Sequence, residues 1–411
     1  MKIAYTFHHD AANPAVQSGL PASSLSGLQR LGVSILPVFP LSTKPRKAYA
    51  KKIISRVTGK CYRTDREPAY LEAAASEFDI RTADKDYDFV CTPGSEIVGY
   101  LRTSKPITFC SDATFANMVD YYWDFTNLDP AYLRMGHKQE AAALARASLA
   151  VYSADWAAKS AINDYGADPA KVAVIPFGAN IGKENTWPEV RRWIERRPRD
   201  EIRILFVGRH WERKGGDIVV EAAYCLAKLG HKVSVDIVGC PIPARHRALP
   251  WLRGHGLLSP RIAEHMARLH DLFTRAHFVF VPSRAEAYGM TFAEANAYGI
   301  PAISTNTGGI AGVVKNGYNG HLLGIDATPR DYADLIAASF ANPAHYDRLC
   351  AQSFEAFARN HNWDAFCKRF VALAVERGLG PPPLEGARGT RFDAPPRATG
   401  RELFSAKEAW A

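Results

Sequence analysis

The chain has 411 residues and a net charge of +9, with 47% apolar and 23% charged residues. This size and composition predict a globular protein of two domains with a substantial core. No apolar run approaches the length that spans a bilayer, and the N-terminus, MKIAYTFHHD, lacks the apolar core of a secretory signal. The seven cysteines are scattered without a CxxC pair, which favours reduced thiols in a cytoplasmic protein over a disulfide framework or a zinc site.

Strand-like apolar runs alternate with helix-like segments from the start of the chain. Such alternation predicts a mostly parallel sheet with helices on both faces. In the first half, strands are expected at 3–7, 33–39, 87–91, 107–110, 149–152 and 172–175, with helices at 23–31, 70–78, 139–147 and 156–165.

The alternation breaks at about 182–200, where the polar stretch ENTWPEVRRWIERRPRD carries two prolines. We interpret this stretch as a connection between domains that contains a short helix. The alternation then resumes, which predicts a second α/β unit and a cleft between the two. Strands are expected at 202–207, 233–238, 278–281 and 302–304, and helices at 217–229, 261–275, 291–298, 331–341, 347–359 and 363–377.

Positive charge is concentrated in the 20-residue window 44–63, which holds eight of the lysines and arginines. Apolar residues recur between them at roughly helical spacing. A solvated helix explains this pattern, and so does a surface that contacts an anionic membrane or an anionic acceptor. Nucleic acid is disfavoured as a partner because no RNA- or DNA-binding motif accompanies the charge.

The segment VGRHWERKGG, residues 207–216, follows an expected strand and precedes an expected helix. A phosphate here would meet helix N-terminal amides together with fixed positive charge. Arg209 and Lys214 lie five residues apart, so they are able to close on one diphosphate from two sides. A solvated basic loop explains the same residues. The segment is neither a Walker loop nor a GxGxxG motif.

Two glutamates lie in the stretch HFVFVPSRAEAYGMTFAEANAYGIPAISTNTGG, with Glu286 in the loop after a strand and Glu294 inside the next helix. A carboxylate at a strand's carboxyl end accepts hydrogen bonds from sugar hydroxyls, and one in the helix suits the two hydroxyls of a ribose. Backbone N–H groups of residues 287–290 are placed to meet a phosphate. An ordinary helix with exposed acids is the alternative.

Two positions in the first half lie at the same kind of strand end. Gly19 falls between the first strand and its helix, where a glycine lets the backbone approach a ligand, although a simple helix-entry turn explains it too. Asp112 follows the strand ITFC, residues 107–110, and an acid there would orient an acceptor or take its proton. A helix N-cap is the alternative for Asp112.

Taken together, these segments resemble the retaining glycosyltransferases of the GT-B fold, family 4 type (glycosyl transferases group 1), over roughly residues 1–378. The resemblance is carried by VGRHWERKGG, by the E-x7-E pattern at Glu286 and Glu294, and by NWDAF at 362–366. It implies an α/β fold with two Rossmann-like, doubly wound domains that face a central cleft. It also implies transfer of a hexose from a UDP- or GDP-linked sugar, with retention of anomeric configuration and no required metal or other cofactor.

The resemblance also implies roles for individual residues. Arg209 and Lys214 would hold the donor diphosphate, Glu286 the donor sugar and Glu294 the ribose, with Asp112 as a candidate acid or base. The remaining donor contacts would be Gly19, Gly208, Arg213, Ala287, Tyr288, Gly289, Met290 and Thr291.

The sequence departs from that family's pattern at three places. Ser111 stands where many members have a histidine, Ala311-Gly312 replaces an acidic residue after the glycine turn, and Ser18-Gly19 replaces a doubled glycine. Two other interpretations therefore stay open. One is a GT-B epimerase or phosphorylase, and the other is a non-catalytic subunit that binds a sugar nucleotide or a glycan.

We expect the acceptor to be a carbohydrate or a lipid-linked molecule, and the protein to be cytoplasmic with a peripheral contact to the inner membrane face through 44–63. The residues after Gly378 include five prolines and few apolar side chains, which predicts a flexible tail. The expected domains are 1–183 on the acceptor side, a connection at 184–200, a nucleotide-sugar domain at 201–360, a closing helix at 361–378 and the tail at 379–411.

Overall fold

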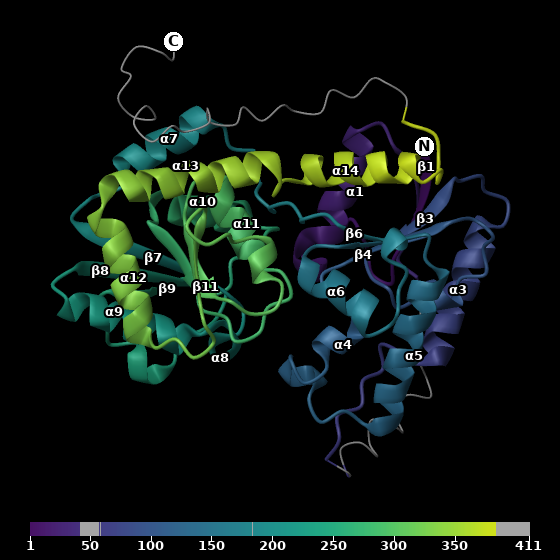
Figure 1. Ribbon diagram of the computed structural model, residues 1–411, viewed down its shortest axis with the longest axis horizontal. Helices are drawn as coiled ribbons and strands as arrows, with labels where there is room; N and C mark the ends of the chain where they lie inside the picture. Colours follow the sequence, from purple (N-terminus) through teal and green to yellow (C-terminus); the bar gives the residue numbers. More distant parts are fainter. Residues whose placement is uncertain (42–56, 58, 183, 384–411) are drawn as a thin grey trace. The chain divides into compact units, whose positions relative to one another are not determined.

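A computed structural model describes residues 1–41, 57, 59–182 and 184–383 (Figure 1). Most of the expected basic helix at 44–63 and most of the tail at 379–411 lie outside the described residues. The chain divides into two compact units. Unit 1 comprises Met1–Pro176 and the described residues from Phe366 onward, and unit 2 comprises Phe177–Ala365.

Unit 1 is built on a six-stranded parallel sheet in the order β2-β1-β3-β4-β5-β6. Its central strands are apolar runs whose side chains are buried on both faces, as parallel strands covered by helices require. The strands are β1 (Lys2–Thr6), β2 (Ser34–Val38), β3 (Phe89–Thr92), β4 (Ile107–Ser111), β5 (Leu149–Tyr152) and β6 (Val172–Val174).

Helices cover both faces of this sheet. A buried cluster that includes Phe78, Phe109 and Tyr152 fills the space between the sheet and α3, α5 and α6. On the other side Phe370 of α14 packs against Phe89 of β3, so the last helix of the chain returns to the first sheet. The helices are α1 (Leu20–Arg30), α3 (Pro68–Thr82), α4 (Phe115–Met118), α5 (Pro130–Arg146), α6 (Asp155–Asn163) and α14 (Trp363–Glu376).

Unit 2 repeats this plan with a parallel sheet in the order β12-β11-β10-β7-β8-β9. The central strand β10 is buried along its whole length, and it lies between β7 and β11. The strands are β7 (Glu201–Val207), β8 (Lys232–Val238), β9 (Leu252–Gly254), β10 (Phe278–Val281), β11 (Ala302–Thr305) and β12 (Gly320–Leu323).

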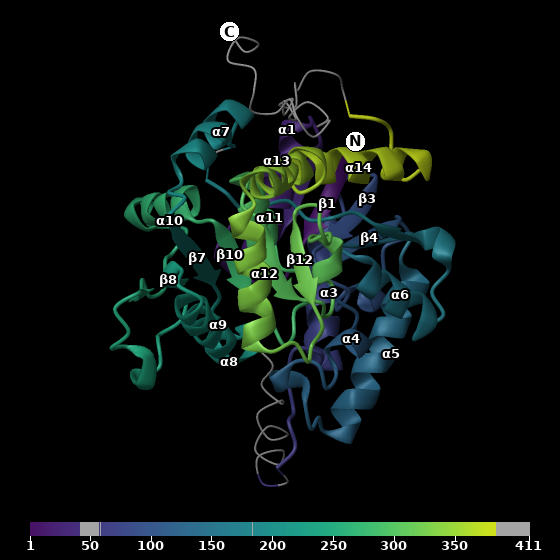
Figure 2. The ribbon, with the colours of Figure 1, turned by 60° about the vertical axis from the view of Figure 1, so that its left-hand side comes forward.

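The helices of unit 2 lie in two groups. Helix α9 packs against α12, whereas α11 packs against α13 and α10 against α7 (Figures 1 and 2). The helices are α7 (Trp187–Arg196), α8 (Trp211–Lys214), α9 (Gly216–Lys228), α10 (Ala263–Arg275), α11 (Met290–Ala297), α12 (Pro329–Ala341) and α13 (Pro343–Arg359).

The predicted α/β class with two doubly wound sheets is confirmed. Each strand expected from an apolar run coincides with an observed strand. The sequence missed β9, which has three residues, and β12, whose run Gly320–Leu323 contains a glycine and a histidine. Both are edge strands of their sheet, where burial on both faces is not required and the apolar signal is therefore weak.

Each sheet has a switch point, where neighbouring strands lead to connections that run in opposite directions. In unit 1 it lies between β1 and β3, and in unit 2 it lies between β7 and β10. Loops that follow the carboxyl ends of such strand pairs leave a crevice, and this crevice is where open α/β sheets bind ligands. The fold therefore gives each unit one preferred place for a site.

Candidate functional site

In unit 2 both motifs identified in the sequence follow the two strands of the switch point. The segment Gly208–Gly216 follows β7, and Pro282–Gly289 follows β10. Because β7 and β10 are hydrogen-bonded neighbours, the two segments lie at the same edge of the sheet. The sequence stretches that were predicted independently to contact a donor are thus joined by the sheet.

Two glycines allow the first segment to fold tightly against its surroundings. A Cβ on Gly208 would lie 2.8 Å from Cγ of Lys214, so only a glycine leaves room for the lysine side chain. Gly215 has a positive φ of 76°, and it ends α8 and begins α9. The glycines therefore fix the path of the chain between the end of β7 and the start of α9.

The centre of the site is an ion pair between Lys214 and Glu286, which come from the two segments. Both side chains are largely buried, with exposed fractions of 11% and 13%. Arg213 lies beside them, with Nη1 at 3.7 Å from Oε2 of Glu286 and donating to the carbonyl oxygen of Ala285 at 2.7 Å. Two cations and one carboxylate are therefore held together at the mouth of the switch point.

The sequence did not predict a second contact between the two segments. Arg284 donates two hydrogen bonds to the carboxylate of Asp217, at 2.7 and 3.0 Å, and its backbone N–H donates to the carbonyl oxygen of Arg213. Asp217 lies in the first turn of α9, so this pair ties the second loop to the helix start. The signal for it in the sequence is only an arginine and an aspartate 67 residues apart, which no spacing rule detects.

Helix α11 begins behind Glu286. Gly289, with φ of 98°, is its N-cap, and a Cβ there would lie 2.5 Å from the buried ring of Phe292. Glu294 lies in the second turn and is only partly exposed. Loss of hydration raises the pKa of Glu294 to about 8, although the charge of Lys214 acts in the opposite direction. The site thus holds one carboxylate paired with a lysine and a second one with a strong affinity for its proton.

The structure does not join every predicted donor residue to this centre. Arg209 is exposed, and it forms no ion pair with any residue in the described part of the chain. The side chains of Ala287 and Tyr288 are buried, and the Tyr288 hydroxyl donates to the carbonyl oxygen of Phe177 at 2.8 Å. Met290 and Thr291, in the first turn of α11, are half-buried.

The other two predicted residues lie in unit 1. Gly19 is buried, has φ of 84° and is the N-cap of α1. Asp112 is exposed in the loop after β4. Gly19 and Asp112 belong to unit 1, whereas Lys214 and Glu286 belong to unit 2. The expected roles of Gly19 and Asp112 therefore stay predictions.

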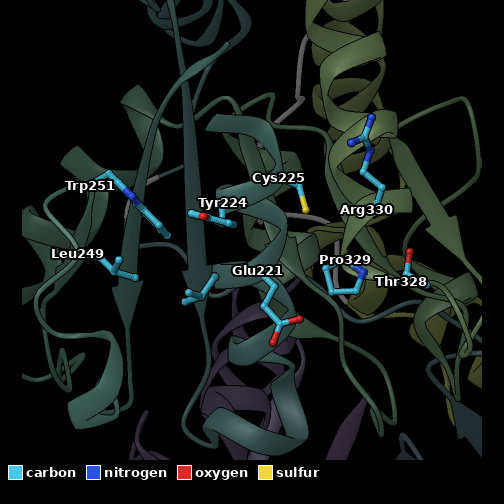
Figure 3. A pocket seen from close by; sticks show the side chains of 9 residues that line it. Glu221, Tyr224, Cys225, Leu249, Trp251, Thr328, Pro329 and Arg330 are labelled. Atoms are coloured by element: carbon cyan, nitrogen blue, oxygen red, sulfur yellow. The ribbon is translucent and has the colours of Figure 1, made fainter. Parts of the chain in front are cut away.

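Unit 2 also has a surface pocket of about 420 Å³, whose lining does not include Lys214 or Glu286 (Figure 3). In Figure 3, Trp251 and Leu249 lie on one side of Tyr224, and Pro329 and Thr328 lie on the other. None of the predicted site residues lines this pocket, and its walls are mostly apolar. Its chemistry differs from that of a phosphate site, so the candidate site remains at the switch point.

Within the described ranges, no group of three or more histidine, cysteine, aspartate or glutamate residues is arranged to hold a metal ion. None of the helices found there combines the length and apolar character that crossing a bilayer requires.

The comparison with protein families assigns this region to a known model. Residues 189–355 match the model described as "Glycosyl transferases group 1". This span includes Lys214, Glu286 and Glu294, and therefore both segments of the candidate site.

Curated relatives of the chain include two proteins named as D-inositol 3-phosphate glycosyltransferases. The chain is 32% identical over 259 residues to a D-inositol 3-phosphate glycosyltransferase from Nocardioides sp., which is 57% of this chain and 54% of that protein. It is 30% identical over 243 residues to the protein of that name from Thermobifida fusca, which is 55% of this chain and 54% of that protein. The chain thus spans about half the length of the curated relatives it matches.

Solved structures match nearly the whole chain. Sucrose-phosphate synthase from Thermosynechococcus elongatus has a TM-score of 0.67 at 18% identity, with 92% of this chain and 98% of that one covered. The Anabaena protein Alr3699/HepE in complex with UDP and glucose has a TM-score of 0.59 at 14% identity, with 91% and 99% covered. These likenesses show that the fold is that of the GT-B glycosyltransferase structures.

Proposed function

We propose that the protein is a glycosyltransferase, which moves a sugar from a nucleotide-diphospho-sugar to an acceptor hydroxyl. The observation that carries this proposal is the ion pair between Lys214 and Glu286 at the switch point of unit 2. A nucleotide diphosphate needs a cation at this place, and a sugar needs a hydrogen-bond acceptor beside it. The match of this region to a glycosyltransferase family model supports the same conclusion.

The donor diphosphate is assigned to Lys214 and Arg213, with Arg209 able to reach a phosphate from its exposed position. Helices α9 and α11 begin beside this place, and their N-terminal N–H groups and dipoles favour an anion. Negative charge grows on the diphosphate as the bond to the sugar breaks. Fixed cations and helix starts stabilise that charge without rearrangement, which is the main source of catalysis in this proposal.

The two glutamates are assigned different parts of the donor. Glu286 is placed to accept hydrogen bonds from sugar hydroxyls once a phosphate competes for Lys214, and Glu294 to accept those of the ribose. We take UDP-glucose as the first donor to test, because one of the structural neighbours is a complex with UDP and glucose. The nucleobase and the sugar of the natural donor are left to experiment.

In the proposed reaction, the acceptor oxygen forms a bond to the anomeric carbon on the face that the diphosphate leaves, so the configuration is retained. The bond between that carbon and the diphosphate oxygen breaks, and its electron pair stays on the diphosphate. The acceptor's proton passes to a base, for which Asp112 is the candidate, or to a phosphate oxygen of the leaving group.

The acceptor is assigned to unit 1. The relatives named D-inositol 3-phosphate glycosyltransferase support a cyclitol or carbohydrate as its class. The expected cytoplasmic location and the membrane contact through 44–63 stay predictions.

Replacement of Lys214 tests the function. Lys214→Ala should lower the release of nucleoside diphosphate from UDP-glucose, in the presence of acceptor, by about 10²–10³-fold, which is typical of the loss of one charge-stabilising group. Lys228→Ala, at the other end of α9, is the matched control and should retain turnover. Both variants should unfold near the wild-type temperature.

Two results would count against the proposal. Near-normal turnover by Lys214→Ala would remove the lysine from the donor site. Failure of the wild-type chain to release nucleoside diphosphate from a panel of UDP- and GDP-sugars with any acceptor would favour a binding subunit without catalysis.

A further inference from the structure

The switch point of unit 1 carries a cluster of polar side chains that the donor site does not use. His8 follows β1, and Ser95 and Glu96 follow β3, so they lie at the carboxyl ends of the two switch-point strands. Arg66, from the segment before α3, and Glu140, from α5, reach the same place. This is the position at which an open α/β sheet binds a ligand.

The centre of the cluster is a buried ion pair between Arg66 and Glu140. Their exposed fractions are 2% and 1%, and Nη1 of Arg66 lies 3.5 Å from Oε2 of Glu140. Ser95 Oγ donates to the same oxygen at 2.8 Å, and the Arg66 guanidinium lies over the ring of Phe115. The positive charge of Arg66 is therefore enclosed by its partners.

This cluster contains more polar atoms than its own contacts satisfy. Among the described residues, Nε of Arg66, Oε1 of Glu140, the hydroxyl of Tyr152 and Nδ1 of His8 are buried without a hydrogen-bond partner. Glu140 contributes to the raised pKa of Tyr152, second to burial, which indicates that the two side chains are close. Buried unsatisfied groups are rare in folded proteins, and a cluster of them indicates a place that water or a ligand enters.

The rim of the cluster presents carboxylates. Glu96 is 29% exposed, and Oε1 lies 3.8 Å from Nη2 of Arg66 beneath it. Asp65 is 38% exposed, and it accepts hydrogen bonds from Arg63 at 3.2 Å and from the Tyr132 hydroxyl at 2.9 Å. Arg63 also pairs with Asp124, at 2.5 Å. Within the described part of this cluster, both cations are thus paired with acids, while the rim acids keep oxygens toward solvent.

His8 extends the rim without adding charge. Burial lowers the pKa of His8 below its ordinary value, against the opposing effect of Glu96, so the imidazole is neutral at pH 7. A neutral imidazole is both a hydrogen-bond donor and an acceptor, as a hydroxyl group is. The groups around the rim therefore suit hydroxyls, which donate and accept in the same way.

We propose that this cluster is the acceptor site and that it takes an uncharged polyol, a sugar or a cyclitol, with neighbouring hydroxyls held by Glu96. The inference rests on the proposed glycosyl transfer. A carboxylate binds a vicinal diol because it accepts two hydrogen bonds at once. A phosphate ester would instead meet the like charge of Glu96 and Asp65, so this chain should prefer the unphosphorylated form of an acceptor.

Calorimetric titration of the whole chain with inositol, inositol 3-phosphate, glucose and glucose 6-phosphate tests the proposal. In at least one of the two pairs, the uncharged member should bind, and it should bind at least 10-fold tighter than its phosphate ester. Glu96→Gln should weaken that binding at least 10-fold, because it removes charge from the hydrogen bonds while it keeps the side chain's shape. Glu72→Gln, an exposed position on α3, is the matched control and should bind as the wild type does.

Tighter binding of the phosphate esters, binding of none of the four probes, or equal affinities for Glu96→Gln and Glu72→Gln would each overturn the proposal. Turnover of UDP-glucose distinguishes a wrong acceptor site from a wrong proposed function. If nucleoside diphosphate is released but Glu96→Gln keeps the acceptor KM of Glu72→Gln, transfer stands and the site is wrong. If the polyol binds through Glu96 but no donor is turned over, the site stands and transfer is wrong.

Discussion

The switch point of unit 2 and the switch point of unit 1 occupy the same place in the same kind of sheet, and they carry opposite arrangements of charge. In unit 2 the cation Lys214 lies at the mouth, 11% exposed, where an incoming phosphate is able to reach it. In unit 1 the cation Arg66 lies beneath the surface, 2% exposed, with the carboxylate of Glu96 at the rim. One crevice therefore suits an anion, and the other suits hydroxyl groups.

From this difference we propose that strand order determines where each unit binds its ligand, and that the depth of one charged side chain determines the class of that ligand. The Arg66 guanidinium lies between the carboxylates of Glu140 and Glu96, so a phosphate at the rim would meet the charge of Glu96 before it reached the cation. Lys214, at the end of the short helix α8, is buried less deeply than Arg66, and it pairs with Glu286. The sharpest tests of this comparison change one group at a time.

After Lys214→Ala, the largest effect is expected from the two glutamates of the E-x7-E pattern in unit 2. Glu286→Ala should lower turnover of UDP-glucose by about 100-fold, equivalent to about 3 kcal/mol, because it removes the group that orients the sugar and the partner of Lys214. Glu294→Ala should act mainly on donor affinity, measured as the Kd of UDP. Identical kinetic profiles for the two variants would break the proposed division between sugar and ribose.

A smaller effect is expected from glycines that stand beside the two sites. Gly289→Ala in unit 2 introduces a Cβ against the buried ring of Phe292 at a positive φ, and it should cost about 2–3 kcal/mol of unfolding free energy. Gly94 in unit 1 also has a positive φ. The Cβ that Gly94→Ala adds would meet the carboxylate end of Glu96, which is able to move. This substitution should cost about 1 kcal/mol.

Gly230→Ala is the control for this pair. Its φ is 89°, and a Cβ there would have no neighbour within 4 Å, so its cost is that of the backbone alone. Urea unfolding of the three variants should rank Gly289→Ala as the least stable. Equal losses of unfolding free energy for Gly289→Ala and Gly230→Ala would show that the ring of Phe292 moves away from the new Cβ at no cost.

The last expected effect is a pH dependence of stability from Glu294. The folded-state pKa of about 8 is raised above the ordinary value of 4.5, so the folded protein keeps a proton that the unfolded chain has released. Stability from this group therefore falls as the pH rises from about 4.5 to 8. Glu294→Gln removes the titration, so its stability relative to the wild type should increase across this window by about 1–2 kcal/mol.

The same series contains its own control. Near pH 4.5 both the variant and the wild type are neutral at position 294 in the folded state, so the slope should begin only above that pH. A constant difference in unfolding free energy between pH 5 and pH 8 would mean that Glu294 is ionised throughout, and that its environment is wetter than its partial burial indicates.

The sequence by itself determined the fold class, and the reason is local. A buried parallel strand must be an apolar run, and its helix must carry an apolar face, so alternation is visible in the chain without any tertiary contact. The two donor motifs were visible for the same reason, because Lys214 and Glu286 each lie beside a strand end that the pattern predicts. The edge strands β9 and β12 were missed because the pattern is weak where burial is partial.

Only the tertiary structure decided which charges meet. Lys214 and Glu286 are 72 residues apart, and they meet because β7 and β10 are neighbours in the sheet. Arg66 and Glu140 are 74 residues apart, and they meet where the segment before α3 packs beside α5. The packing of α14 on the first sheet is also a tertiary feature, since Phe370 contacts Phe89, which lies 281 residues earlier in the chain. The composition of a motif is local, but its electrostatic surroundings depend on neighbours that no spacing along the chain reveals.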